Sequence, residues 1–413
     1  MNKLPVIDKC AARLLMVSFF LPMQLQVWAV MAVSVYFVSR TFIEKERIPR
    51  SNFVWALILG SGYLLYLFSF PLTPAEYKGM LSTLCERRVS FLLMPFVFAI
   101  ITPRFGGLIW RELIWFVYGC LVSCIAGNAG FVYQYYFAAG MHTLSHMGYR
   151  LIFETFTGIH PTYMGMYLCF SICILLVSPG FNTGGAVIVK YVLVYLLLFF
   201  LLSLLPKSAL IALVIIFIHY AYLHRRNLLK YKIRIAALLA SVIAACFFIP
   251  FTGQRVKEIL SYFGYGKPGS TVDNSVYIRK LIWDVDTGLL KPNWLTGVGP
   301  GRMLHMLHER YFFYSLANHF NVGYYDPHNE YFSTWLSFGI IGITLFVAVL
   351  AIHCIRAIRG KNNLYSYLLI ILCITFCTET VLSRQQGVLF YAVFTSLFFF
   401  LNSYHQPDDS KQR

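Results

Sequence analysis

Charged side chains are scarce in this sequence. Asp, Glu, Lys and Arg make up 12% of its 413 residues, whereas they make up about 25% of a typical soluble domain. Hydrophobic residues account for 58% of the chain. This composition excludes an ordinary soluble protein and predicts an all-α integral membrane protein, organised as a single polytopic domain over residues 1–413.

Acidic residues are especially few. The chain has 17 Asp and Glu against 34 Lys and Arg, which gives a formal net charge of +17. In a soluble protein this excess would indicate a nucleic-acid partner, but here most basic residues lie in short loops between apolar segments. Cytoplasmic loops of membrane proteins are enriched in Lys and Arg in this way. The charge therefore predicts a membrane topology and no nucleic-acid partner.

Two further absences narrow the class. The longest polar segment, residues 252–328, has no cysteine, and all cysteines except Cys10 and Cys85 lie inside apolar runs. This distribution argues against a disulfide framework. No small-residue cleavage site follows the basic and apolar N-terminus, so we expect it to be a retained first span rather than a signal peptide.

Long apolar segments predict about twelve membrane-spanning helices, since about 20 apolar residues cross the hydrocarbon core. Residues 12–39 are predicted to form two short spans that break near Pro22. Two spans place the basic residues of 40–50 on the same side as those of 225–234 and 356–361, as expected for the cytoplasm. Both termini, including the tail 403–413, are then cytoplasmic. The other predicted spans are 52–70, 89–103, 112–133, 161–178, 188–205, 208–223, 235–251, 331–354, 364–382 and 387–402.

Residues 252–328 form a long polar segment late in the chain, and this topology places them on the extracytoplasmic side of the membrane as a large, partly helical loop. Polar side chains at the ends of apolar segments gather on the same side. Ionisable groups next to the membrane are costly and are functional candidates by default. These residues are His160, Lys207, Arg279, His328 and Arg384.

The strongest motif is Asp326-Pro-His-Asn-Glu-Tyr331, where the large loop leads back into an apolar run. Pro327 disfavours helical structure before it, so His328 is predicted to open the next helix. The helix dipole would keep the imidazole neutral there, as a general base must be. The alternative is an interfacial His that only caps or anchors the span.

Two basic residues are candidates for binding phosphate. Arg279 lies in a predicted amphipathic helix around Tyr277–Trp283, and an Arg side chain binds phosphate through two parallel hydrogen bonds. Lys207 lies in the short turn Leu204–Ala209 between two predicted spans. The structural alternatives are a solvated helix face for Arg279 and a lysine that extends from the membrane interface for Lys207.

Three other patterns are less specific. Gly297-Val-Gly-Pro-Gly301 lacks the strand and helix of a phosphate loop and is predicted to be a structural turn. His305 and His308 follow neither order of the zinc-protease motifs, so we predict no metal site and no cofactor. Glu379 lies about one helical turn inside the membrane and either forms an ion pair with Arg384 or contacts the substrate.

Together these features resemble the O-antigen ligase and polymerase superfamily, multi-span bacterial envelope enzymes that act on glycans linked to polyprenyl diphosphate. The resemblance covers residues 150–390 and lies in the layout of spans, the late periplasmic loop and several short motifs. These motifs are His160-Pro-x-Tyr163, Lys207 before a Ser-Ala apolar run, Arg279 four residues before Trp283, Gly297-Val-Gly299 and Pro327-His-Asn-Glu330.

The resemblance implies that two periplasmic basic residues bind the donor diphosphate while a loop histidine activates the acceptor hydroxyl. Arg279 and His328 match these positions and are the expected catalytic residues. Lys207 stands where the family commonly has Arg and lacks its forked geometry. Arg384 is a further candidate for the diphosphate. The candidate substrate contacts are His160, Tyr163, Asn329 and Glu330.

The expected activity is a metal-independent, inverting glycosyl transfer at the periplasmic face of the inner membrane, from undecaprenyl diphosphate to a lipid A-core acceptor. Two alternatives within the same group are a polymerase that extends glycan on its polyprenyl carrier and a ligase that glycosylates proteins. A polysaccharide transporter is the alternative from a different class. Transport is expected to require charged residues at mid-membrane or an inverted repeat, and the sequence places its charge at the outer ends of the spans.

Overall fold

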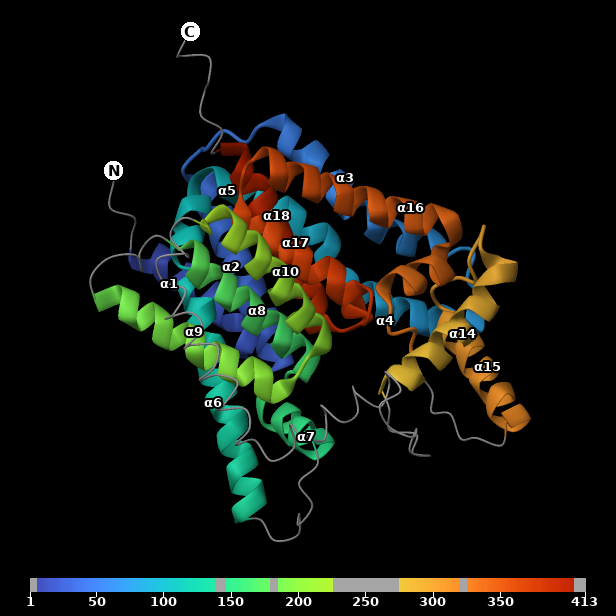
Figure 1. The fold of residues 1–413 in the computed structure, drawn as a ribbon. Helices are drawn as coiled ribbons and strands as arrows, with labels where there is room; N and C mark the ends of the chain where they lie inside the picture. The colour runs from blue at the N-terminus through green and yellow to red at the C-terminus, as the bar shows by residue number, and fades with distance from the viewer. Residues whose placement is uncertain (1–5, 138–145, 179–184, 226–274, 319–324, 405–413) are drawn as a thin grey trace. The chain divides into compact units, whose positions relative to one another are not determined.

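The computed structural model describes residues 6–137, 146–178, 185–225, 275–318 and 325–404, and these residues form helices and no strand (Figure 1). The all-α expectation is confirmed for this part of the chain. The chain divides into two compact units, each made of segments that are distant in sequence.

Six helical stretches in the described residues are long and apolar enough to cross a membrane, or seven if a bent pair counts as one span. They support a multi-pass membrane protein, while the number of about twelve spans stays a prediction. The expected span 235–251 lies outside the described residues. The six are α2 (Met23–Ile43), α3 (Arg50–Ser69), Ala75–Arg111, α6 (Ile114–Tyr136), α9 (Gly185–Leu204) and α16 (Glu330–Arg359); the bent pair is α7 (His146–Thr157) with α8 (Pro161–Val177).

One of these spans is composite, and three further apolar helices are shorter. Ala75–Arg111 contains the 3₁₀ turn η2 (Ala75–Tyr77), α4 (Lys78–Arg88) and α5 (Ser90–Arg111). Shorter apolar helices are α10 (Lys207–Leu223), α17 (Asn363–Phe376) and the part of α18 (Gln385–Tyr404) up to Leu401.

The N-terminal region breaks where its sequence predicts. α1 (Val6–Val17) and the 3₁₀ turn η1 (Ser18–Phe20) are separated from α2 by Leu21 and Pro22. Proline has no backbone N–H and clashes with the preceding turn, so it ends a helix or begins the next one. The break near Pro22 is confirmed, although α1 has only 12 residues.

The first unit comprises Met1–Phe37, Gly107–Gly269 and Ile370–Ile374, and its described part is built around α8. Every residue from Pro161 to Leu175 is buried, and α8 packs against α6, α9 and α10 (Figure 1). A helix that is apolar on all sides is expected in the interior of a bundle, and α8 occupies that place.

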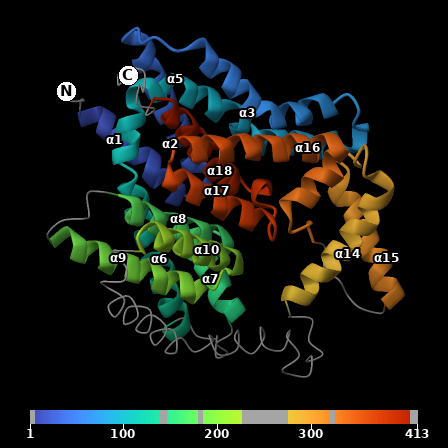
Figure 2. The same ribbon diagram turned by 45° about the horizontal axis from the view of Figure 1, so that its top comes forward.

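The second unit comprises Val38–Gly106, Ser270–Leu369 and Thr375–Arg413, and its described part is built around α16. α16 packs against α3, α14 (Ser275–Asn293) and α18, and Figure 2 shows α3 lying along it. α14 also packs against α15 (Met303–Asn318). These two helices belong to the predicted loop 252–328, whose residues 252–274 and 319–324 lie outside the described residues. The described part of the loop is helical, and its periplasmic location stays a prediction.

The turn Gly297–Gly301 packs into a kink of α16 at Gly339, which has φ +63°. A Cβ atom at Gly339 would lie 2.1 Å from the carbonyl oxygen of Leu295, so only glycine fits there. The N–H of Val298 donates to the carbonyl oxygen of Leu336 at 2.7 Å, which satisfies an acceptor that the kink frees. The turn is structural, as its sequence predicted, and it attaches the α14–α15 pair to α16.

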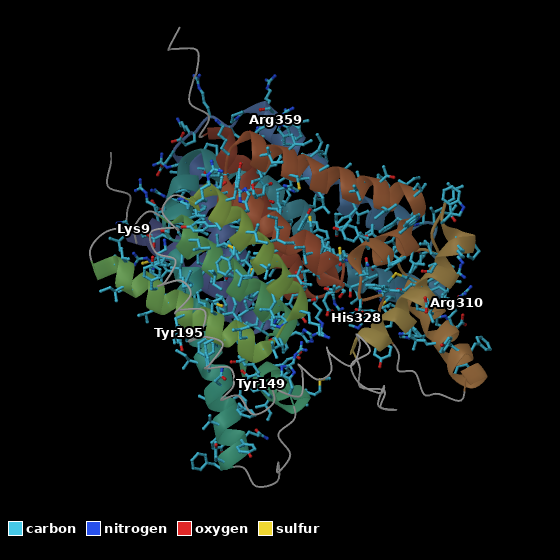
Figure 3. All side chains as sticks on the ribbon, viewed as in Figure 1. Lys9, Tyr149, Tyr195, Arg310, His328 and Arg359 are labelled. Carbon is cyan, nitrogen blue, oxygen red and sulfur yellow. The ribbon has the colours of Figure 1, made fainter. Side chains whose placement is uncertain are left out.

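The two ends of α16 carry different groups. Arg356 and Arg359 lie in its last turn, whereas His328 comes just before its first turn. Figure 3 shows His328 and Arg359 at opposite ends of this helix. Because basic residues mark the cytoplasmic ends of spans, His328 lies at the end for which the charge rule predicts a periplasmic location.

Candidate active site

Glu379 joins the two predicted catalytic residues of the second unit. It lies between α17 and the 3₁₀ turn η4 (Val381–Ser383). One of its carboxylate oxygens accepts a hydrogen bond from Arg279 Nη2 at 2.7 Å, and the other lies 3.0 Å from His328 Nδ1. The side chains of Arg279, His328 and Glu379 are 25%, 32% and 16% exposed, so a substrate has access to all three.

The backbone holds His328 in an uncommon conformation. Its φ is +44°, and its N–H donates to Asp326 Oδ1 at 3.2 Å. A left-handed conformation at a residue other than glycine costs about 1–3 kcal/mol and is concentrated at functional sites. Asn329 is the N-cap of α16, and its side chain accepts a hydrogen bond from Phe332 N at 3.1 Å. The helix therefore begins at Glu330, and the prediction that His328 opens it is wrong.

The charges around His328 also differ from expectation. Burial and the charge of Arg279 lower the pKa of His328. The hydrogen bond and charge of Glu379, together with the charge of Asp326, raise it by more, so the pKa of His328 is above its ordinary value. Asp326 Oδ1 lies 3.5 Å from His328 Nε2. Thr380 fixes Asp326 by donating to its Oδ2 at 2.6 Å. The dipole argument predicted a neutral imidazole, and this direction is wrong because two carboxylates act at closer range.

The contact with Glu379 also decides which imidazole nitrogen can act. An ionised carboxylate only accepts hydrogen bonds, so Nδ1 carries the proton in the neutral ring. The lone pair of Nε2 is then the basic position. Orienting one tautomer in this way, and strengthening the base, is what a carboxylate does for a catalytic histidine. His328 is thus arranged to take a proton through Nε2.

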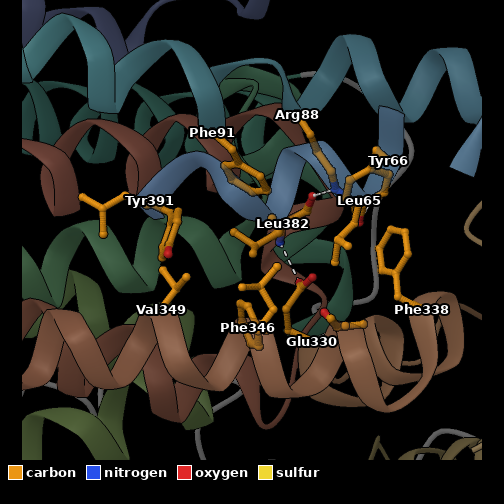
Figure 4. A pocket seen from close by; sticks show the side chains of 15 residues that line it. Leu65, Tyr66, Arg88, Phe91, Glu330, Phe338, Phe346, Val349, Leu382 and Tyr391 are labelled. Carbon is orange, nitrogen blue, oxygen red and sulfur yellow. Dashed lines mark hydrogen bonds between the residues drawn. The ribbon is translucent and has the colours of Figure 1, made fainter. Parts of the chain in front are cut away.

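A second, buried polar cluster lies next to this site (Figure 4). Arg88 Nε donates to the carbonyl oxygen of Leu382 at 2.9 Å, and the Leu382 N–H donates to Glu330 Oε2 at 2.8 Å. Arg88 also donates to the hydroxyl of Tyr66, and its guanidinium lies 4.6 Å from the centre of that ring. Arg88 is 5% and Glu330 is 2% exposed.

This Arg88–Leu382–Glu330 cluster holds both backbone polar groups of Leu382, three residues after Glu379. It therefore fixes η4 and the segment that presents Glu379 to His328. Glu330 was expected to contact the substrate, but its burial and its bond to Leu382 favour a positioning role.

An apolar pocket adjoins the buried cluster. Figure 4 shows Arg88 and Glu330 beside side chains that include Phe346 and Val349 of α16 and Tyr391 of α18. The mainly hydrocarbon lining matches a hydrocarbon chain better than a sugar, because a sugar would leave hydroxyl groups without partners.

The other predicted phosphate-binding residues have different positions. Arg384 follows η4 in the second unit, five residues beyond Glu379, and is exposed. Lys207 is the first residue of α10 in the first unit, after Pro206 as N-cap. The structure thus brings Arg279 and His328 together through Glu379, puts Arg384 on the same segment as Glu379, and places Lys207 in the other unit.

His160 and Tyr163 also belong to the first unit. His160 is the N-cap of α8, where its Nδ1 accepts a hydrogen bond from Thr162 N at 3.3 Å. It follows a bend of 75° between α7 and α8. Tyr163 is 4% exposed, and its ring centre lies 5.9 Å from that of His160. Both contacts lie at the start of α8, next to the bend, and the expected substrate contacts of His160 and Tyr163 stay predictions.

The two histidines of α15, His305 and His308, belong to no cluster of metal-ligand side chains in the described residues. His305 Nδ1 is 3.6 Å from Glu309 Oε1, and its ring packs against Tyr77. Within the described ranges, no group of three or more His, Cys, Asp or Glu residues is placed to hold a metal ion. His319, the third histidine that the sequence places near His305 and His308, lies outside those ranges.

Sequence reasoning missed two residues. Arg88 immediately precedes an apolar run, and an arginine there is a signal for a buried partner. Asp286 is fully buried on α14, seven residues after Arg279. That spacing of about two helical turns puts both on one face of the helix, and this signal was present in the sequence.

Comparison with known families gives a match for this chain. Residues 191–347 match a family model described as O-antigen ligase. The matched region includes Lys207, Arg279 and His328 and ends before Glu379. The resemblance drawn from the motifs is thereby confirmed. The chain matches no curated protein.

Proposed function

We propose that this protein is a glycosyltransferase of the O-antigen ligase type, which moves a glycan from undecaprenyl diphosphate to a lipid A-core acceptor at the periplasmic face of the inner membrane. The observation that carries the proposal is the Arg279–Glu379–His328 cluster, in which an oriented base lies beside a cation at the end of a membrane span. The family match over residues 191–347 supports an enzyme of the ligase and polymerase group.

His328 acts as the general base. The acceptor hydroxyl gives its proton to Nε2 while its oxygen attacks the anomeric carbon of the donor. Glu379 holds Nδ1–H and favours the imidazolium that forms. A general base of this kind contributes roughly 10²- to 10⁴-fold to a rate.

The leaving group is the lipid diphosphate. The bond between the anomeric carbon and the diphosphate oxygen breaks, and its electron pair stays on that oxygen. Arg279 is placed to stabilise the charge that develops there, since its Nη2 is held by Glu379 and its side chain is 25% exposed. Arg384 lies on the segment that carries Glu379 and is a further cation for the diphosphate, and Lys207 stays a candidate from the sequence. A single displacement inverts the anomeric centre.

The test is a strain that lacks the gene, complemented with the wild-type chain or with an empty vector. Lipopolysaccharide is resolved by gel electrophoresis next to the pool of polyprenyl-linked glycan. Loss of capped lipopolysaccharide, with long glycan accumulating on the carrier, is the result expected for a ligase. Lipopolysaccharide with a single repeat unit and short carrier-linked glycan would instead identify a polymerase. An unchanged ladder and pool would overturn the proposed function.

A further inference from the structure

Asp286 is a buried acid that the mechanism above does not use. It lies on α14 and is 0% exposed, in the apolar core formed by α14, α15 and α16. Neither of its carboxyl oxygens has a hydrogen-bond partner among the described residues. An ionised carboxylate in such a place loses its hydration without compensation, which costs several kcal/mol. A group left in this condition calls for a functional explanation.

The surroundings of Asp286 favour its neutral form. Burial and, to a smaller extent, the charge of Asp326 raise its pKa to about 8, although the charge of His328 opposes the shift. Tyr311, which is also fully buried, faces it from α15, and burial together with the charges of Asp286 and Asp326 raises the pKa of its hydroxyl. At neutral pH both groups therefore carry their protons.

Asp286 is close to the proposed site on two sides. Arg279 precedes it by two turns on the same face of α14. From the other side, the ring of Tyr311 is 6.2 Å from that of Tyr325, which is 6.3 Å from the ring of His328. The charged groups that shift the pKa of Asp286 are Asp326 and His328, which both precede α16.

We propose that Asp286 holds a proton in the folded enzyme and so keeps a further negative charge away from the diphosphate site at neutral pH. The catalytic part of this inference rests on the proposed function. When Asp286 is neutral, it adds no negative charge to that of Glu379, which is paired with Arg279. When the pH rises and Asp286 loses its proton, its charge repels the anionic donor. Asp286 is a positioning residue that sets the upper pH limit for donor binding.

The first experiment measures thermal unfolding of the purified full-length protein and its Asp286→Asn variant at pH 5 and pH 8. The folded protein holds the Asp286 proton more tightly than the unfolded chain, so wild type loses stability as pH rises from about 4 towards 8. The variant has no such proton. We expect Asp286→Asn to unfold at a higher temperature than wild type, with a larger difference at pH 8. A variant that is less stable than wild type at pH 8 would overturn the inference.

The second experiment measures the donor KM from pH 6 to pH 9 in vesicles, with polyprenyl-linked glycan isolated from the gene-deletion strain. Wild type is expected to show a several-fold rise in KM above pH 8 that Asp286→Asn lacks. Asp284→Asn, an exposed acid on the same helix, is the matched control and should follow wild type. Identical KM profiles for Asp286→Asn and wild type would overturn the inference. If wild type transfers no glycan at all, the proposed function fails, while the unfolding experiment still decides whether Asp286 holds its proton.

Discussion

The Arg88–Leu382–Glu330 cluster and the Arg279–Glu379–His328 cluster share two short segments of the sequence but differ in the exposure and in the partners of their side chains. In the Arg88–Leu382–Glu330 cluster the charged side chains are at most 5% exposed, and both are bound to the backbone of Leu382. In the Arg279–Glu379–His328 cluster the side chains are 16–32% exposed. The first consists of buried groups with fixed partners, which give rigidity. The second keeps accessible donors and acceptors, which a reaction requires.

Backbone strain separates the two clusters further. His328 has φ +44°, whereas Glu330, two residues later, is the first residue of helix α16. A strained residue persists only where its surroundings over-determine it. The buried cluster supplies part of that support, because it fixes the chain on either side of the contact between His328 and Glu379. The comparison predicts that substitutions in the exposed cluster change chemistry and that those in the buried cluster change stability.

The largest effect is expected for His328→Ala. Loss of the base should lower the rate of glycan transfer by about 10²- to 10⁴-fold, while the protein still inserts in the membrane and unfolds at a similar temperature. Transfer is measured with purified carrier-linked donor in vesicles. His305→Ala is the matched control, since His305 is 54% exposed on α15 and forms a similar pair with a glutamate. Full transfer by His328→Ala would show that His328 is not the base.

The next effect is expected for Glu379→Gln. The variant keeps the size of the side chain but removes the charge that raises the His328 pKa, so a rate lower by about 10²-fold is expected. Only neutral His328 accepts a proton, so activity rises with pH through its pKa. Because the variant lowers that pKa, the acidic limb of the pH profile should move to lower pH.

Glu309→Gln serves as control for this shift, because Glu309 lies 3.6 Å from His305 in an exposed pair. Its profile should coincide with that of wild type. An acidic limb that stays in place in Glu379→Gln would mean that a different group titrates there.

A smaller effect is expected for the buried cluster. Glu330→Ala leaves the Leu382 N–H without an acceptor in a buried place, which should cost about 1–3 kcal/mol of unfolding free energy. Glu330→Gln keeps an acceptor oxygen and should lose less than half of that. Thermal unfolding gives the stability, and the same vesicle assay gives the rate. If both variants abolish transfer without loss of stability, Glu330 contacts the substrate, as its motif first suggested.

Local sequence patterns predicted the parts of this structure that depend on neighbouring residues. The break at Pro22 and the structural turn at Gly297–Gly301 both follow from short segments. The pairing of Glu379 with Arg279 joins residues 100 positions apart, and that of Arg88 with Leu382 joins residues 294 apart. A single sequence carries no spacing that reveals such contacts.

The error about His328 has the same origin. The sequence predicts a neutral imidazole from the helix that follows His328, because that helix is a local feature of the sequence. The carboxylate of Glu379 arrives from a segment 51 residues away and acts at 3.0 Å. A charge at hydrogen-bond distance outweighs a helix terminus, whose partial charge is about half a unit and acts from farther along the chain.

The smallest effect is expected for Lys207→Arg, and it extends the comparison to the first unit. The substitution keeps the charge and adds the forked geometry that suits phosphate, so the rate should stay within about threefold of wild type. Lys207→Ala should raise the donor KM.

If Lys207 and Arg279 bind the same diphosphate, the effects of their alanine substitutions on the donor KM will not be additive. A double-mutant cycle should then give a coupling of about 0.5–3 kcal/mol. Additive effects would mean that Lys207 does not bind the diphosphate together with Arg279. Arg384 would then be the remaining candidate for a second cation beside Arg279.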